Sequence, residues 1–219
     1  MDRAFGRLEE FDERSRAFPV RTLIGDRPLR SYKWRCETRL DQGSEGSCVG
    51  HGFAHNLAAR PVEIAGVTSD LAVKIYKTAQ TLDPWPGEAY SGTSVLAGAK
   101  STMQLYPKSF DSYRWCFGLN DVCLTLGYRG VVILGIKWLS GMDRPDAQGI
   151  IKARGQLRGG HCLIADGIDV STRYIRLLNS WGRSYGLEGH CWISFDDLNG
   201  LLQDGGEGLV TVKQHKFDL

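Results

Sequence analysis

The seven residues Gln42–Cys48, with the sequence QGSEGSC, decide how the rest of the chain is interpreted. Ser47 can cap a helix that runs to about Arg60 and stops at Pro61. Cys48 is then expected in the first turn of that helix, where unpaired backbone N–H groups and the helix dipole favour an anion. A nearby cation would lower the pKa of such a cysteine. A lone cysteine in a helix is more often buried and inert, so the interpretation depends on what else the chain supplies.

Two later segments carry groups that could act together with a thiolate. Gly159 and Gly160 precede His161, whose imidazole can be a base or a cation near neutral pH. Asn179 ends an apolar strand, where its carboxamide must find partners and could hold an imidazole in one orientation. The neighbouring Trp181 could shield that bond from water. Each segment alone is explained by packing, but the joint signal of the three segments is far stronger than that of any one.

Together these motifs resemble those of the papain-like cysteine peptidases, whose pattern is Gln-Gly-x-x-Gly-Ser-Cys, then Gly-His, then Asn-Ser-Trp-Gly. Gln42 precedes Cys48 by six residues, as that pattern requires. The resemblance covers about 32–216 and is weakest over about 60–125, where Gly92 looks like the glycine loop that borders the substrate cleft. It implies an α+β fold of two lobes. The N-terminal half would be mainly helical and the C-terminal half an antiparallel β-sheet or barrel, with the active-site cleft between them.

The resemblance also implies a role for individual residues. Cys48 would be the nucleophile, and His161 its ion-pair partner and later the general acid for the leaving amine. Asn179 would orient His161 through the other ring nitrogen. The Gln42 carboxamide and the Cys48 backbone N–H would form the oxyanion hole. Three further residues would border the substrate, with Gly92 pairing with an extended substrate strand: Gly92, Gly160 and Trp181.

The function implied is a cysteine peptidase that hydrolyses peptide bonds through a thiolate–imidazolium pair and an acyl-enzyme. Its partner would be a protein or peptide substrate in extended conformation, and it would need no metal or cofactor. Other acyl transfer on the same machinery stays open, as an isopeptidase, amidase or transpeptidase. A catalytically silent binding or structural module stays open too. Glu45 motivates it, since a carboxylate aimed at Cys48 would raise the thiol pKa, and so does Val49, which replaces the usual Trp.

The chain divides into three parts by composition and periodicity. Residues 1–30 read as a charged arm or short prosegment with one short helix near Arg7–Arg14, and any processing is expected between Arg14 and Arg30. Residues 31–126 form the mainly helical lobe and 127–219 the β lobe. Further helices are expected from Thr68 or Ser69, from Ser94 and over Leu119–Leu126, and strands over Val131–Trp138, Ile150–Ala153, His161–Ile168, Arg173–Asn179, His190–Phe195 and Leu209–His215.

Composition limits the partners and the compartment. A net charge of +2 over 219 residues gives no reason to expect nucleic acid. The longest apolar run, 131–139, contains a Lys and is half the length that a bilayer span needs, so no membrane is expected. With no secretory signal, we expect a cytoplasmic or otherwise non-secreted protein, with a virion component left open, and six reduced cysteines. The oligomeric state stays open.

One competing arrangement involves the first turns of the same helix. Cys48, His51 and His55 have the spacing Cys-x-x-His-x-x-x-His, which could bind zinc or copper. The resemblance argues against a metal site, because Cys48 should face the cleft alone. One of the two imidazoles is therefore expected to be packed and the other exposed.

Overall fold

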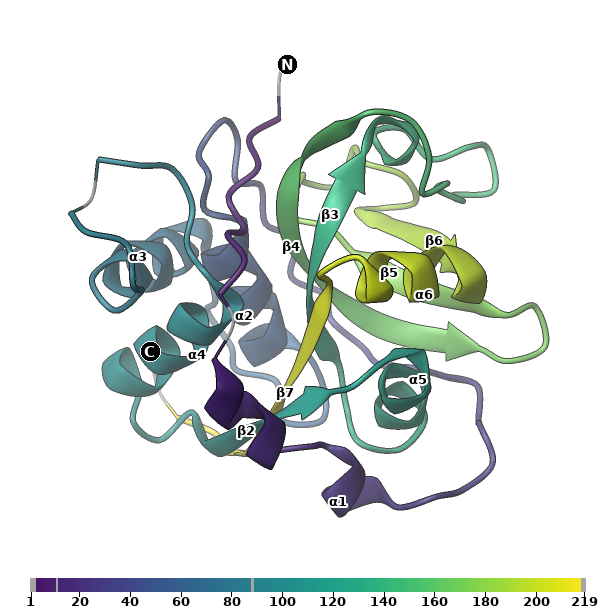
Figure 1. The fold of residues 1–219 in the computed structure, drawn as a ribbon, viewed down its shortest axis with the longest axis horizontal. Helices are drawn as coiled ribbons and strands as arrows, with labels where there is room; N and C mark the ends of the chain where they lie inside the picture. Colours follow the sequence, from purple (N-terminus) through teal and green to yellow (C-terminus); the bar gives the residue numbers. More distant parts are fainter. Residues whose placement is uncertain (1–2, 11, 88, 218–219) are drawn as a thin grey trace.

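The computed structural model describes residues 3–10, 12–87 and 89–217, which form a helical part and a sheet part side by side (Figure 1). None of the described helices is long and apolar enough to cross a membrane. The helices are η1 Glu13–Ala17, α1 Arg21–Ile24, α2 Cys48–Ala58, α3 Ser69–Gln80, α4 Val95–Leu105, α5 Leu119–Tyr128, η2 Ser140–Met142 and α6 Phe195–Gln203. The strands are β1 Tyr32–Lys33, β2 Phe110–Cys116, β3 Val132–Leu139, β4 Leu157–Asp169, β5 Tyr174–Leu178, β6 His190–Ser194 and β7 Glu207–Gln214.

Helices α2, α3 and α4 form the helical part around the fully buried α2. Two of them begin where the sequence predicts, because the Thr68 and Ser94 hydroxyls accept from the backbone N–H groups of Leu71 and Ala97. α2 packs closely because it carries glycines. A Cβ on Gly50 would lie 2.0 Å from the Ala72 carbonyl oxygen of α3.

The sheet has the strand order β2-β7-β3-β4-β5-β6, with β1 paired to β4, and every pairing is antiparallel. Successive residues of β3 and β4 face opposite sides, as strand geometry requires. Ile133 and Ile164 join the core shared with α2 and α4, whereas Leu134 and Leu163 join the core shared with α5 and α6. The sheet thus lies between two cores, and the α+β architecture expected from the sequence is confirmed.

Three local predictions differ from the structure. Ile150–Ala153 forms only a single bridge, from Ile150 to Trp192, because the Asp146 carboxylate accepts the Ile150 N–H and holds a turn there. The short helix predicted near Arg7–Arg14 forms later, as the 3-10 helix η1 at Glu13–Ala17, and residues 7–10 are non-helical chain with a bridge from Arg7 to Thr93. Strand β2 lies in a region expected to be mainly helical, and it pairs with β7.

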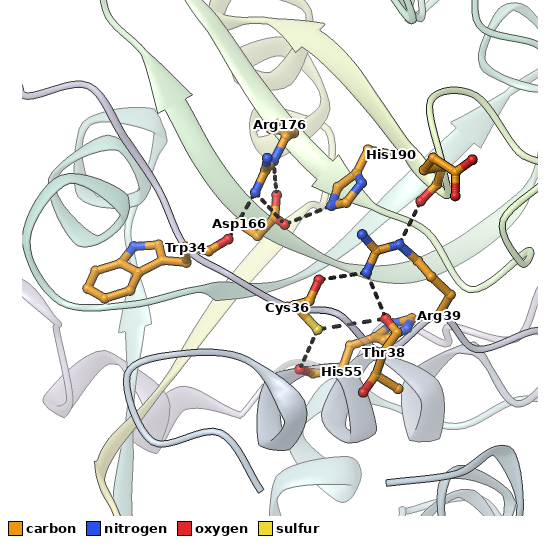
Figure 2. A network of polar contacts seen from close by, with 9 residues as sticks. Trp34, Cys36, Thr38, Arg39, His55, Asp166, Arg176 and His190 are labelled. Carbon is orange, nitrogen blue, oxygen red and sulfur yellow. Dashed lines mark hydrogen bonds and ion pairs between the residues drawn. The ribbon is translucent and has the colours of Figure 1, made fainter. Parts of the chain in front are cut away.

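A buried polar network fixes the segment that leads to Gln42 (Figure 2). The Asp166 carboxylate on β4 is fully buried and accepts from Arg176 Nε at 2.9 Å and from His190 Nε2 at 3.0 Å. Arg176 also donates to the Trp34 carbonyl oxygen. Arg39 donates to the Cys36 carbonyl oxygen at 2.6 Å. Arg176 therefore links the chain that precedes the site to β5 and, through Asp166, to β4, the strand that carries His161.

Candidate active site

Cys48 lies in the first turn of α2 and is completely buried. α2 packs against β4 so closely that a Cβ on Gly52 would lie 2.9 Å from Cys162 Sγ. Burial raises the pKa of the Cys48 thiol to about 11, and backbone hydrogen bonds from Cys162 and Gly6 only partly oppose this rise. The lowered pKa that a nearby cation would give is therefore not found in this structure, where Cys48 is a neutral thiol.

His161 lies on β4, and its ring is hydrogen-bonded to Asn179. Its Nε2 is 2.8 Å from Asn179 Oδ1, and its Nδ1 is buried with no hydrogen-bond partner among the described residues. Burial lowers the pKa of His161 to about 4, although the bond to Asn179 raises it. The imidazole is neutral in this structure, with one nitrogen oriented and the other available to a partner.

Aromatic rings enclose this imidazole. The rings of Trp138 and Trp181 have their centroids 4.9 and 5.1 Å from that of His161, and the Phe5 ring lies at 5.7 Å. Trp181 is nearly fully buried. Trp181 therefore packs against the ring that bonds to Asn179, together with Trp138 and Phe5. The sequence did not point to Trp138 or Phe5, because neither lies within a motif.

Gln42 lies beside the N-terminus of α2. Its Nε2 donates to the Glu45 carbonyl oxygen at 2.8 Å and to the Ala4 carbonyl oxygen at 3.2 Å. Its Oε1 accepts from Ser180 Oγ at 2.7 Å, so the orientation of the carboxamide is fixed. Ser180 is a positioning residue that the sequence reasoning did not single out, although it lies in the Asn-Ser-Trp-Gly motif.

Residues 3–10 lie across this site, where the N-terminal segment passes between the helices and strands β3 and β4 (Figure 1). The Arg7 N–H donates to the Gly160 carbonyl oxygen at 2.9 Å. The Thr93 N–H donates to the Gly6 carbonyl oxygen at 2.8 Å, and the Leu8 N–H donates to the Thr93 carbonyl oxygen at 2.9 Å. The arm is thus bound as a short extended strand between the two parts of the molecule.

The expected substrate-binding residues all touch this arm. Gly92 has φ +103°, and a Cβ there would lie 2.5 Å from the Gly6 carbonyl oxygen. A Cβ on Gly160 would lie 2.0 Å from the Arg7 carbonyl oxygen. The backbone groups that pair with the arm on the helical side belong to Thr93, since those of Gly92 bind Tyr76 and Gln80 side chains. Gly92 therefore leaves space for the backbone of the arm, and Thr93 makes the backbone hydrogen bonds to it.

No family model matches the chain, and neither does any curated protein. Solved structures do match. Xylellain, a cysteine protease from Xylella fastidiosa, superposes with a TM-score of 0.71 at 15% identity, over 97% of this chain and 98% of xylellain. Procathepsin L2 from Tenebrio molitor gives 0.61 at 16% identity, over 96% and 78%. Bromelain from Ananas comosus, solved with the inhibitor E64, gives 0.59 at 12% identity, over 85% and 100%.

The chain has the papain-like cysteine peptidase fold. Two residues that depart from the papain-like pattern have structural explanations. Glu45 pairs with Lys77, with 3.8 Å between Oε1 and Nζ, and the largest causes of the raised pKa of Cys48 do not include it. Val49 is fully buried, and a Cβ on Gly98 of α4 would lie 2.6 Å from its Cγ1. The space beside Val49 is therefore filled by α4.

The two histidines of α2 are both buried, so the expectation that one is exposed is wrong. His51 Nδ1 lies 3.0 Å from the Ser47 carbonyl oxygen, and His55 Nε2 accepts from the Leu40 N–H at 3.2 Å. Burial lowers the pKa of both. Each imidazole thus bonds to a backbone group within the helical part of the papain-like fold.

Proposed function

We propose that this chain is a cysteine peptidase in which Cys48 attacks the substrate and His161 transfers protons. The observation that carries the proposal is the His161–Asn179 bond at 2.8 Å. It leaves His161 Nδ1 without a hydrogen-bond partner in the described part of the chain, on the strand against which the helix of Cys48 packs. Gln42 supplies a side-chain donor at the same helix terminus. A nucleophile, an oriented base and a polar donor are the groups that acyl transfer requires.

The reaction follows from these groups. His161 takes the thiol proton, and Cys48 Sγ attacks the carbonyl carbon of the peptide bond. The oxygen that becomes negative accepts hydrogen bonds from Gln42 Nε2 and the Cys48 N–H. The C–N bond then breaks, the amine leaves with the proton of the His161 imidazolium, and an acyl-enzyme remains. A water molecule, deprotonated by His161, hydrolyses the thioester and frees Cys48.

Residues 3–10 act in this proposal as a short prosegment that holds the peptidase latent. The arm covers Cys48 and His161, and its Ala4 carbonyl oxygen occupies the Gln42 donor. Burial then favours the uncharged forms of both the thiol and the imidazole, which is the opposite of an ion pair. Within this proposal, 1–30 is the arm, 31–126 the helical lobe with the nucleophile, and 127–219 the β lobe with His161 and Asn179.

The test compares the full chain with variants on a denatured protein and a mixed peptide library, using mass spectrometry of the products. We expect slow cleavage by the native chain, faster cleavage by Arg7→Ala, whose arm is released, and none by Arg7→Ala combined with Cys48→Ser. In the Arg7→Ala background, Gln42→Ala should lower kcat by roughly 10²–10³. Products that carry an added amine instead of water would indicate transpeptidation. No Cys48-dependent product from any variant would favour the silent module.

A further inference from the structure

A second thiol, that of Cys162, lies beside the proposed nucleophile and has no part in the proposed reaction. Cys162 directly follows His161 on β4 and is completely buried, in the same core as Cys48. All six cysteines are free thiols in this structure. Two free thiols therefore lie in one core, on the side of β4 that faces α2.

The two thiols meet where α2 packs against β4. The Cys162 N–H donates a hydrogen bond to the Cys48 sulfur. Gly52, one helical turn after Cys48, leaves space for the other sulfur, because a Cβ there would lie 2.9 Å from Cys162 Sγ. Side chains one turn apart on a helix have their Cβ atoms only about 5–6 Å apart. The Cys162 sulfur therefore lies next to the first turn of α2, and a charge on Cys48 raises the pKa of Cys162, as expected of close neighbours.

The Arg7 side chain of the arm fills the space on the same face of the sheet. Cys162 pairs with Gly135 of β3, so both residues face the same side. A Cβ on Gly135 would lie 2.9 Å from Arg7 Nε and from Glu207 Oε1. The Arg7 side chain is only 2% exposed, and its Nε and Nη2 donate to Glu207 Oε1 at 2.9 and 2.7 Å. The arm thus covers Cys162 as well as Cys48, and its release would open both thiols to small reagents.

We propose that Cys162 is a modification site, which forms a reversible disulfide with Cys48 when the arm is displaced and a hydroperoxide reaches the cleft. The thiolate is the form of cysteine that a peroxide oxidises. A cysteine oxidised once can recover, but a second oxidation, to the sulfinic acid, is irreversible. A neighbouring thiol that reacts first would therefore protect the nucleophile. The inference requires a reactive thiol at Cys48 and does not require peptide cleavage.

The reaction balances with hydrogen peroxide as the oxidant. The Cys48 sulfur attacks one peroxide oxygen, an S–O bond forms, the O–O bond breaks, and the departing hydroxide leaves as water with the proton of the Cys48 thiol. The Cys162 sulfur then attacks the Cys48 sulfenic acid. An S–S bond forms, the S–O bond breaks, and a second water carries away the Cys162 proton. A small dithiol reverses the modification by exchange.

The test treats the full chain carrying Arg7→Ala with one equivalent of hydrogen peroxide and maps the products without reduction. Trypsin gives peptides 40–74 and 159–173, each with a single cysteine, and we expect them as one linked species. Labelling of Cys48 by iodoacetamide should be lost on oxidation and return after dithiothreitol. With Arg7 intact the linked species should form more slowly, because the arm covers both thiols.

Two substitutions separate this disulfide from general oxidation. With Cys162→Ala the linked species should be absent, and Cys48 should instead become a sulfenic acid that dimedone traps and then a sulfinic acid that dithiothreitol does not reverse. Cys162→Ser serves if the alanine variant does not fold. Cys36→Ala is the matched control, because Cys36 lies in the same core but its sulfur contacts the His55 carbonyl oxygen, two turns farther along α2 than Cys48. It should leave the linked species unchanged.

Sulfinic acid at Cys48 without the linked species in the Arg7→Ala chain would overturn the inference, and so would a Cys48 that the peroxide leaves unmodified. A linked species that forms equally fast with Arg7 intact would contradict the role of the arm. Peptide cleavage by the reduced Arg7→Ala chain is a separate measurement. A linked species in a chain that cleaves no peptide would sustain the disulfide and count against the peptidase.

Discussion

Cys48 and His161 are both held in their uncharged forms by burial, at a site that residues 3–10 lie across. Beneath residues 3–10, the thiol pKa is raised to about 11 and the imidazole pKa is lowered to about 4, and in both cases burial is the largest cause. A thiolate and an imidazolium stabilise one another only if the charges can be solvated or paired. Displacement of the arm is therefore expected to change the chemistry of both groups at once.

Alkylation of Cys48 by iodoacetamide tests this dependence. Because the thiolate is the form that reacts and the pKa is about 11, labelling of the intact chain should be slow at pH 6 and rise with pH throughout the accessible range. Arg7→Ala should make labelling fast at pH 6, and His161→Ala in that background should slow it again. The measurement is peptide mass after timed quenching.

Arg14→Ala is the matched control for this experiment, because Arg14 is an exposed arginine of the same arm that pairs with Asp12 outside the cleft. It should leave the labelling rate unchanged. Fast labelling of the intact chain at pH 5, with no effect of Arg7→Ala, would show that the arm does not control the thiol.

At the scale of elements, one residue, Ser94, makes hydrogen bonds both to the arm and to helix α4. Ser94 caps α4 by accepting from the Ala97 N–H at 2.9 Å, and its hydroxyl also donates to the Glu10 carboxylate of the arm. Thr68 caps α3 in the same way, by accepting from the Leu71 N–H, and it makes no hydrogen bond to the described residues of the arm. Loss of either cap should destabilise its helix, but only the loss of the Ser94 hydroxyl also removes a hydrogen bond to the arm. Comparing the two residues therefore distinguishes helix stability from attachment of the arm.

Ser94→Ala and Thr68→Ala should each lower the free energy of unfolding by about 1 kcal/mol, as loss of a helix N-cap usually does. Only Ser94→Ala should also speed cleavage by trypsin after Arg7, because it removes one attachment of the arm. Urea denaturation measures the first effect, and mass spectrometry of a short digestion measures the second. Equal rates of cleavage at Arg7 in the two variants would contradict a role of Ser94 in holding the arm.

The sequence predicted the helices and strands that carry local signals, and with them most of the site. Cys48, His161 and Asn179 lie in short motifs, and Thr68 and Ser94 are typical N-caps, so their elements follow from neighbouring residues. The path of Gly6–Leu8 cannot be predicted from neighbouring residues, because its partners, Thr93 and Gly160, lie far along the chain. Tertiary pairing of this kind overrides local preference and leaves no periodicity to read.

At the scale of the whole molecule, three histidines are buried with lowered pKa values: His51, His55 at about 3 and His161 at about 4. In the unfolded chain each would have a pKa near 6.5. The folded state therefore holds them neutral, and their contribution to stability is present above pH 6.5. It is lost as the pH falls, because the unfolded chain then binds more protons than the folded one.

We expect the free energy of unfolding to fall as the pH is lowered from 6.5 toward 4, by up to about 1.4 kcal/mol per pH unit for each of these histidines. Glu207 acts in the opposite direction, since its raised pKa favours the fold when it is protonated. Urea denaturation at pH 7.5, 6, 5 and 4 measures the slope, and His161→Gln should make it shallower. A stability that is constant over this range would contradict the prediction.

The chain is attached to the sheet a second time just after the end of η1, and this attachment bears on how the proposed latency would be lost. The Val20 N–H donates to the Trp115 carbonyl oxygen, the Trp115 N–H donates to the Phe18 carbonyl oxygen, and Val20 is fully buried. Residues 3–10 thus end eight residues before a fixed point at Phe18, and a tether this short corresponds to an effective concentration in the millimolar range. A free peptide would need a similar concentration to compete. A single cut at Arg14 or Arg16 would turn the same contacts into an ordinary bimolecular complex, and dilution alone would then empty the cleft.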